Sequence, residues 1–165
     1  MNRKALALSV LSLVATLSFA QAPQPALKVG ATPVPHAELL RLVASELAAQ
    51  GIKLEVVEFT DYVTPNIALA EGQLDANFFQ HVPYLESFSA DRKLSLEAAG
   101  AIHVEPLGVY SKKYLSLDAL PSGATIAIPN DPTNEGRALL LLPSKGLITL
   151  KPGAGLKATL RDIAS

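Results

Sequence analysis

Short β-rich runs alternate with helix-like patterns along the first half of this sequence, and this alternation restricts the fold more than any other feature. The strand-like runs are Leu27–Ala31, Lys53–Phe59 and Leu74–Phe79. Between them, residues 36–50 carry apolar side chains at helical spacing, and residues 62–70 match a shorter helix. A chain that alternates strands and helices in this order builds a mostly parallel sheet with helices on its faces. The sequence therefore predicts an α/β fold.

The alternating pattern continues through the second half of the chain. Two further helices are expected, at Pro83–Ala90 and at Glu135–Leu142, where Pro143 should end the second one. Additional strands are expected at Leu94–His103, Leu107–Tyr110, Thr125–Pro129 and Leu147–Leu150. The pattern restarts after His103, so we place a domain boundary near Val104–Leu107, with a second α/β unit after it.

The first residues have the features of a secretory signal peptide. A basic start precedes the mostly apolar stretch Ala5–Leu17, which is too short to span a membrane with these flanks. Small residues at alternating positions offer cleavage sites after Ala20 or Ala22. We therefore expect residues 1–22 to be removed and the remaining chain to be exported, with an uncleaved membrane anchor as the alternative.

Composition argues against several classes of function. The formal net charge is −1 without a basic cluster, which argues against nucleic-acid binding. The sequence contains no cysteine, so disulfides, thiolate metal sites and a cysteine nucleophile are excluded. It also lacks the G-x-S-x-G and P-loop motifs. Gly153–Ala158 spells G-x-G-x-x-A, but no βαβ unit follows it, so we interpret it as a glycine turn. We expect no enzymatic activity and assign no cofactor.

Tyr62, Phe79 and His81 follow the ends of two neighbouring predicted strands. Side chains at the carboxyl ends of parallel strands can converge on one pocket. Aromatic side chains there suit a small amphipathic ligand such as an amino acid. Because strand alternation points Phe78 and Phe79 to opposite faces, only one of them should face this pocket. We assign Phe79 to the pocket, since it shares a face with His81, and Phe78 to the core.

Arg137 lies at the start of a predicted helix, in the segment TNEGR. A guanidinium can hold a carboxylate in a two-pronged, charge-assisted pair, and the helix N-terminus adds N–H donors. From the residue alone, an ion pair with a surface glutamate is the more common role of an arginine.

His103 lies at the predicted crossover between two lobes, where it could contact a ligand or equally be a structural residue. The residues alone leave both alternatives open.

Segments of the sequence resemble the periplasmic methionine-binding proteins of bacterial ABC importers, the NlpA/MetQ-type family. They are FTDYVTPNIAL, DANFFQHVPYLESF, HVEPLGVYSKKY and IPNDPTNEGRALLLL, and they occur in this order within residues 27–163. The resemblance implies a two-lobe periplasmic-binding-protein fold, with residues 23–104 in the first lobe and residues 105–165 in an incomplete second lobe. Family members continue further, so we expect weak binding or none from these 165 residues alone.

The resemblance also implies a function and a set of binding residues. Arg137 matches the position that holds the ligand carboxylate, and Asn134 matches a neighbouring polar contact. The side chains that would enclose the ligand are Tyr62, Phe79, His81 and His103. The implied function is capture of L-methionine or a related amino acid for an ABC transporter permease. Family members are commonly lipoproteins, but this sequence has no cysteine to carry the lipid, so we expect a soluble exported protein.

A zinc-binding receptor and a non-binding remnant of the same fold are the alternatives. His36, His81 and His103 with Glu105 offer the ligand types of a zinc site. Their spacing lacks a local metal motif such as H-E-x-x-H, so we assign no metal site. His36 follows Pro35 at a helix start, where we expect a cap or surface group.

Overall fold

The computed structural model of the chain describes residues 25–165, so the predicted signal peptide lies outside the described residues. The N-terminal part is built on a three-stranded parallel sheet in the order β2-β1-β3. Its strands are β1 (Leu27–Ala31), β2 (Leu54–Glu58) and β3 (Ala76–Phe78). Val29 pairs with Val56 on one side and with Ala76 on the other, so β1 is the central strand. The predicted α/β class, with a parallel sheet flanked by helices, is confirmed.

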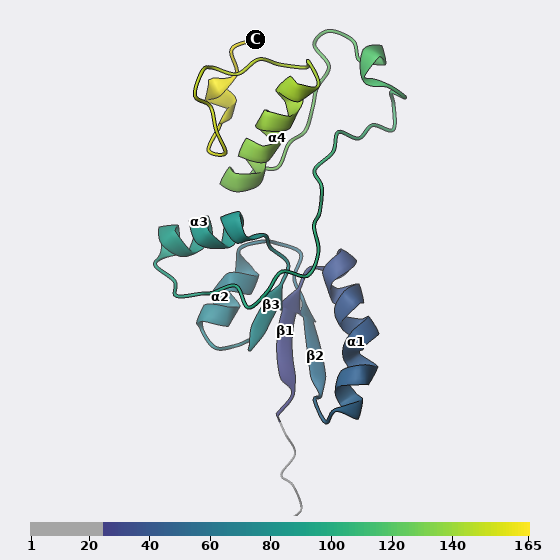
Figure 1. Cartoon of the computed structure of the whole chain (residues 1–165), viewed down its shortest axis with the longest axis vertical. Helices are drawn as coiled ribbons and strands as arrows, with labels where there is room; N and C mark the ends of the chain where they lie inside the picture. The colour runs from purple at the N-terminus through teal and green to yellow at the C-terminus, as the bar shows by residue number, and fades with distance from the viewer. Residues whose placement is uncertain (1–24) are drawn as a thin grey trace, which may run out of the picture.

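Helices connect these strands and cover the sheet. An irregular helical turn, η1 (Pro33–Ala37), leads into α1 (Glu38–Ala49), and α2 (Thr64–Ala70) connects β2 to β3. β1 and β2 are neighbours, whereas the chain passes across β1 to reach β3. Because such crossovers are right-handed, the two helices belong on opposite faces. Figure 1 shows α1 and α2 on either side of the sheet.

The strand order creates a topological switch point between β1 and β3. The connection after β1 leads to its neighbour on one side, while β3 lies on its other side. In open α/β sheets, ligands bind outside the carboxyl ends of the strands at such a point. The segments that follow β1 and β3 are η1 and the start of α3 (Val82–Arg92). From the topology, we expect a binding site between these two segments.

Aromatic side chains form the main buried cluster of the N-terminal part. Phe79, Tyr84 and Phe88 are buried together, and Ile67 and Leu94 pack against them. The cluster joins α2, α3 and the chain after β3 into one body. Burying each of these large apolar side chains stabilises the fold by about 1.5–3 kcal/mol.

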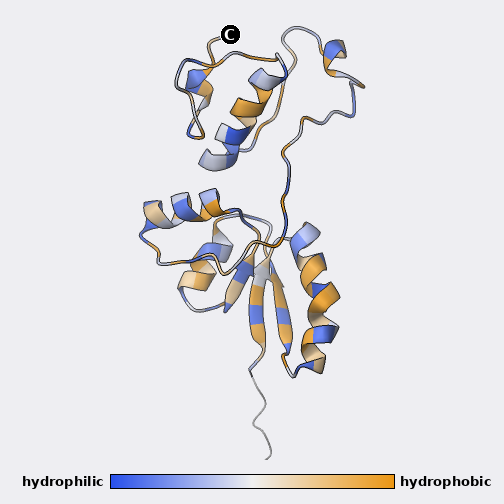
Figure 2. Ribbon diagram, viewed as in Figure 1, coloured by the Kyte–Doolittle hydropathy of each residue, from blue (hydrophilic) through white to orange (hydrophobic). Residues whose placement is uncertain are grey.

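Side chains pack closely on the central strand β1, whereas apolar side chains of α1 are exposed. Ala31 is buried, and a Cβ atom on Gly30 would lie 2.6 Å from Leu74 and 2.9 Å from Phe59. Glycine at this position lets those side chains approach the backbone of β1. Figure 2 shows apolar residues along α1, yet Leu42 on this helix is 72% exposed.

The C-terminal part contains less regular structure. After α3 the chain forms no helix or strand until the short turn η2 (Leu117–Ala119). We call residues 93–116 the crossover segment, and Figure 1 shows it leading to the part that holds α4. The elements that follow are α4 (Pro132–Ser144) and the turn η3 (Leu160–Asp162). The later chain packs closely on α4, because a Cβ on Gly136 would come within 2.0 Å of the Leu156 carbonyl oxygen.

Several predicted strands are absent from the part of the chain that the structure describes. No strand forms at Leu94–His103, Leu107–Tyr110 or Thr125–Pro129. Within Leu147–Leu150, Leu150 forms an isolated antiparallel bridge to Ile163, and the Thr149 backbone bonds to Ala164 and Ser165, but no strand forms. A strand needs a neighbouring strand for its backbone N–H and C=O groups, and the first three runs have no such neighbour within residues 25–165. The predictions are wrong because β propensity alone supplies no partner.

The predicted helices are found, and several of their ends differ from the predicted bounds by a few residues. Pro143 was expected to end the helix that holds Arg137, but it lies inside α4, which begins at Pro132 and ends at Ser144. The helix thus continues through the proline for a single residue. None of the helices within residues 25–165 is long and apolar enough to cross a membrane.

Candidate functional site

A cavity of about 1200 Å³ runs along α1 and β3, passes the carboxyl end of the sheet and extends to the start of α4. Small-molecule sites usually enclose about 300–1,000 Å³, so this space would hold a small ligand together with solvent. The wall of the cavity includes every side chain that the sequence predicts for the ligand: Tyr62, Phe79, His81, His103, Asn134 and Arg137. The structure thus brings together residues that are far apart in the sequence.

Aromatic rings from three segments form one wall of this cavity. The ring centroids of Tyr62, before α2, and Phe79, after β3, are 5.8 Å apart. Tyr84 of α3 lies 6.1 Å from Tyr62 and 6.2 Å from Phe79. Its hydroxyl donates a hydrogen bond of 2.7 Å to the Tyr62 carbonyl oxygen, and burial, with nearby Asp131, raises the pKa of Tyr84. Sequence reasoning missed this role, because Tyr84 matches an ordinary residue of an apolar helix face.

His81 caps α3 and lines the cavity. Its Nδ1 accepts a hydrogen bond of 3.1 Å from the Tyr84 N–H, so the proton of a neutral His81 belongs on Nε2. Nε2 is buried and has no hydrogen-bond partner among the described residues. A buried donor without a partner is unfavourable by about 1–3 kcal/mol. A ligand atom that accepts a hydrogen bond from Nε2 would remove this cost.

One of the two phenylalanines of FFQH, Phe78, differs from the prediction. Phe79 is 6% exposed and belongs to the buried aromatic cluster. Phe78 is half-buried, and its ring packs edge-on against His36 and His103, with centroids 4.7 and 5.6 Å away. The assignment of Phe78 to the core is therefore wrong. β3 ends at Phe78 and the chain turns there toward α3, so strand alternation does not extend to Phe79.

Arg137 is held by its own helix and by the crossover segment. Its guanidinium donates to Asn134 Oδ1 at 2.8 Å and to the Glu105 carbonyl oxygen at 3.3 Å. Asn134 is fixed in turn by Asp131, the N-cap of α4, whose carboxylate accepts from the Asn134 backbone N–H at 2.9 Å. Burial alone would raise the pKa of Asp131, but hydrogen bonds from Asn134 and Thr133 outweigh it and lower the pKa. A positioned cation at a helix N-terminus is suited to binding a carboxylate.

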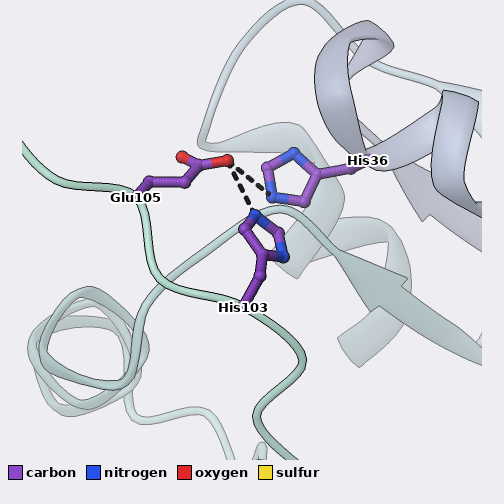
Figure 3. A group of neighbouring side chains, drawn as sticks. All are labelled: His36, His103 and Glu105. Atoms are coloured by element: carbon purple, nitrogen blue, oxygen red, sulfur yellow. Dashed lines mark hydrogen bonds and ion pairs between the residues drawn. The ribbon is translucent and has the colours of Figure 1, made fainter.

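His36, His103 and Glu105 lie close together, as Figure 3 shows. All three line the cavity. Glu105 Oε1 lies 2.9 Å from His103 Nε2 and 3.6 Å from His36 Nε2. On its other side, the His36 ring has Nδ1 2.7 Å from Thr32 Oγ1. Burial lowers the pKa of His36, while the Glu105 carboxylate opposes this shift and His103 adds to it.

Two expectations about the histidines change with this geometry. The prediction that His36 is a cap or surface group is wrong: its side chain is buried, because η1 turns it toward Phe78 and the crossover segment. Of the residues considered as zinc ligands, His81 is not part of the group. It caps α3 instead.

Residues 27–165 match the family model of the NlpA lipoprotein. The chain is 50% identical over 127 residues to the D-methionine-binding lipoprotein MetQ of Escherichia coli (strain K12), an alignment that covers 77% of this chain and 46% of MetQ. It is 43% identical over 150 residues to the membrane lipoprotein TpN32 of Treponema pallidum, covering 91% of this chain and 56% of that protein. The chain thus spans about half the length of these curated relatives.

A solved structure agrees with these matches in both sequence and fold. It is a nutrient binding protein from Burkholderia cenocepacia bound to methionine, with 49% identity and a TM-score of 0.80. The superposition covers 84% of this chain and 59% of that protein. The family match, the identity and the shared fold lead to one conclusion: the chain belongs to the NlpA lipoprotein family.

Proposed function

We propose that this chain forms part of an extracytoplasmic solute-binding protein that captures methionine for an ABC-type importer. The observation that carries the proposal is the cavity, whose wall joins Arg137 at the start of α4 to aromatic rings near the carboxyl ends of the sheet. The relatives support it, since MetQ is named for binding D-methionine and the Burkholderia protein holds methionine. The proposed activity is capture rather than catalysis.

Arg137 would hold the carboxylate of the ligand. A guanidinium has N–H groups for several acceptors, and Arg137 donates to Asn134 and Glu105 while leaving others for a two-pronged contact. The N-terminal end of α4 adds a partial positive charge at the same place. Asn134, held by Asp131, would contact the ligand beside it.

The aromatic wall would hold the ligand side chain. Contacts between a thioether sulfur and aromatic rings contribute about 0.3–1.5 kcal/mol each. Burial of a methionine side chain adds about 1.5–3 kcal/mol. Tyr62 and Phe79 would supply the rings, and His81 and His103 would supply polar atoms around them. We propose L-methionine as the ligand, with D-methionine as the enantiomer to compare.

Two lobes would close on the ligand and then dock on a membrane permease. Residues 23–104 would form one lobe and residues 105–165 would belong to the other, with the crossover segment between them. α3 and α4 contact each other beside the cavity, which gives the two lobes a common boundary. Hinge closure between lobes buries a ligand that each lobe contacts separately. The relatives named as lipoproteins support a site of action outside the cytoplasm.

Thermal unfolding of the chain with and without excess L-methionine tests this proposal. A ligand that binds only the folded state adds about 2.7 kcal/mol of stability at a hundred times its Kd. Because the second lobe is incomplete, we expect these 165 residues to bind weakly, so only a large excess of L-methionine should raise the Tm of the wild-type chain, and by a small amount. The same excess should leave the Tm of Arg137→Ala unchanged. Arg161→Ala is the matched control, because Arg161 is exposed and does not line the cavity.

Two outcomes would contradict the proposal: no rise in the Tm of the wild-type chain, or an equal rise in Arg137→Ala. Norleucine, which has a methylene in place of the sulfur, tests the aromatic wall separately. It should raise the Tm less than methionine does, because the sulfur–aromatic contacts are lost.

A further inference from the structure

We infer that His36, His103 and Glu105 form a binding site for a zinc-like divalent metal ion. One ligand atom from each residue lies within 4.8 Å of the other two. These atoms come from separate segments, since His36 belongs to η1 and the other two to the crossover segment. The site is distinct from the proposed carboxylate contact at Arg137, although His103 also belongs to the proposed methionine pocket.

The spacing of the ligand atoms suits a tetrahedral ion. Zinc binds nitrogen and oxygen ligands at about 2.0–2.2 Å, which puts neighbouring ligand atoms about 3.3 Å apart in a tetrahedron. The Glu105 Oε1 atom lies 2.9 Å from His103 Nε2 and 3.6 Å from His36 Nε2. These two distances fall on either side of the tetrahedral value, and the ring nitrogens of His36 and His103 lie within 4.8 Å of each other, so side-chain rotations would bring all three atoms to an ion.

The surroundings hold His36 in the orientation that a ligand needs. Metal-bound histidines usually hydrogen-bond through their second ring nitrogen, which fixes the tautomer and the ring plane. In His36 this nitrogen is Nδ1, paired with the buried Thr32 Oγ1 at 2.7 Å, so Nε2 is left to face Glu105. Phe78 packs edge-on against both imidazole rings and further restricts their rotation. The metal-facing atoms are therefore placed before any ion arrives.

The ligand set identifies the class of ion. Two imidazoles and one carboxylate are the donors of zinc and neighbouring transition metals, whereas calcium and magnesium prefer all-oxygen sites. The Glu105 side chain is 54% exposed, so an ion has a path from solvent. Three protein ligands leave a fourth position for water or for a polar group of a small ligand.

Calorimetric titration of the tag-free chain with Zn²⁺ tests the site. We expect binding of about one Zn²⁺ per chain, and a Co²⁺-loaded sample with the visible absorption of a tetrahedral site. Glu105→Gln should weaken Zn²⁺ binding at least about tenfold. Glu86→Gln is the matched control, because Glu86 is exposed on α3 and is not part of the group. Its Zn²⁺ affinity should equal that of the wild-type chain.

Thr32→Val tests the proposed positioning role of the Thr32 hydroxyl. It keeps all metal ligands but removes the partner of His36 Nδ1, so we expect Zn²⁺ binding about 10–100-fold weaker. The absence of stoichiometric Zn²⁺ binding, or an affinity unchanged by Glu105→Gln, would overturn the inference.

Arg137→Ala separates this inference from the proposed methionine function. The variant should lose the methionine-dependent rise in Tm and keep Zn²⁺ binding, because the hydrogen bond from Arg137 to Glu105 goes to its main-chain carbonyl and not to its metal-binding carboxylate.

Discussion

Asn66 is a polar residue of α2 with no exposed surface. Its amide nitrogen donates to Gln80 Oε1 at 2.8 Å, and its Oδ1 accepts from Asn77 at 2.8 Å and from Gln80 at 2.7 Å. These bonds hold α2 against the strand end that leads into the cavity. Alanine at this position would remove all three bonds and leave Gln80 Oε1 without a partner, although the Asn77 and Gln80 amide nitrogens keep bonds to the Pro65 carbonyl oxygen and to Asn77 Oδ1. We expect Asn66→Ala to lower the free energy of unfolding, measured with urea, by about 1–3 kcal/mol.

Asn130 provides the matched control for this substitution. It is exposed in the loop before α4, so Asn130→Ala should change the free energy of unfolding by less than about 0.5 kcal/mol. If Asn66→Ala is as mild as this control, the network does not stabilise the fold.

At the level of single residues, the sequence predicts well which side chains line the cavity. It predicts less well which contacts hold those side chains in position. Arg137 and His103 are found because their residue types and motif positions point to a binding role. The contact between Tyr84 and the Tyr62 carbonyl is not found, because it joins residues 22 positions apart through one hydroxyl. The burial of His36 is missed for a similar reason, since it depends on where the crossover segment passes.

The start of α4 is the element on which the position of Arg137 depends. Asp131 caps this helix, and Asp131→Ala removes the acceptor for the Asn134 N–H. We expect a loss of about 0.5–2 kcal/mol in the free energy of unfolding at neutral pH. The fold lowers the pKa of Asp131, so its contribution is complete above the ordinary pKa and is lost as the pH falls through the lowered pKa. The difference between wild type and Asp131→Ala should therefore shrink below about pH 4.

Urea unfolding at several pH values measures this dependence, with Asp118→Ala as the control. Asp118 is an exposed acidic residue in the first turn of η2, whose N-cap makes no side-chain hydrogen bond. Its substitution should have little effect at any pH. A loss in Asp131→Ala that is equally large in acid and at neutral pH would show that the ionised carboxylate is not the source.

Among the elements, the strands that have partners are the ones predicted correctly. The predicted strand Leu27–Ala31 has the same bounds as β1. The predicted strand Lys53–Phe59 contains β2, which runs from Leu54 to Glu58. Both are stabilised by hydrogen bonds to each other. The run Thr125–Pro129 has a similar composition but forms no strand within the described residues. Local pattern identifies a segment that can pair, whereas pairing requires another segment in reach.

The molecule as a whole consists of two packed parts joined by a weakly held connection. The N-terminal part contains the sheet and the aromatic cluster, and the C-terminal part is organised around α4. Between α3 and α4, the only helix or strand within the described residues is η2, a 3-10 turn of 3 residues. Segments with few buried contacts open at low free-energy cost and are the preferred sites of proteolysis.

Limited trypsin digestion should therefore cut the described region first after Lys112 or Lys113. Both residues are exposed, and the local backbone contacts are N–H bonds from Lys113 and Tyr114 to Ser111 Oγ. Cutting at Arg41 or Lys53 requires opening of α1 or of the chain beside β2, which costs more free energy. Mass spectrometry of the early fragments identifies the site. The double variant Lys112→Gln, Lys113→Gln should resist this first cut, and an earlier cut at Arg41 or Lys53 would show that the sheet opens more readily than the crossover segment.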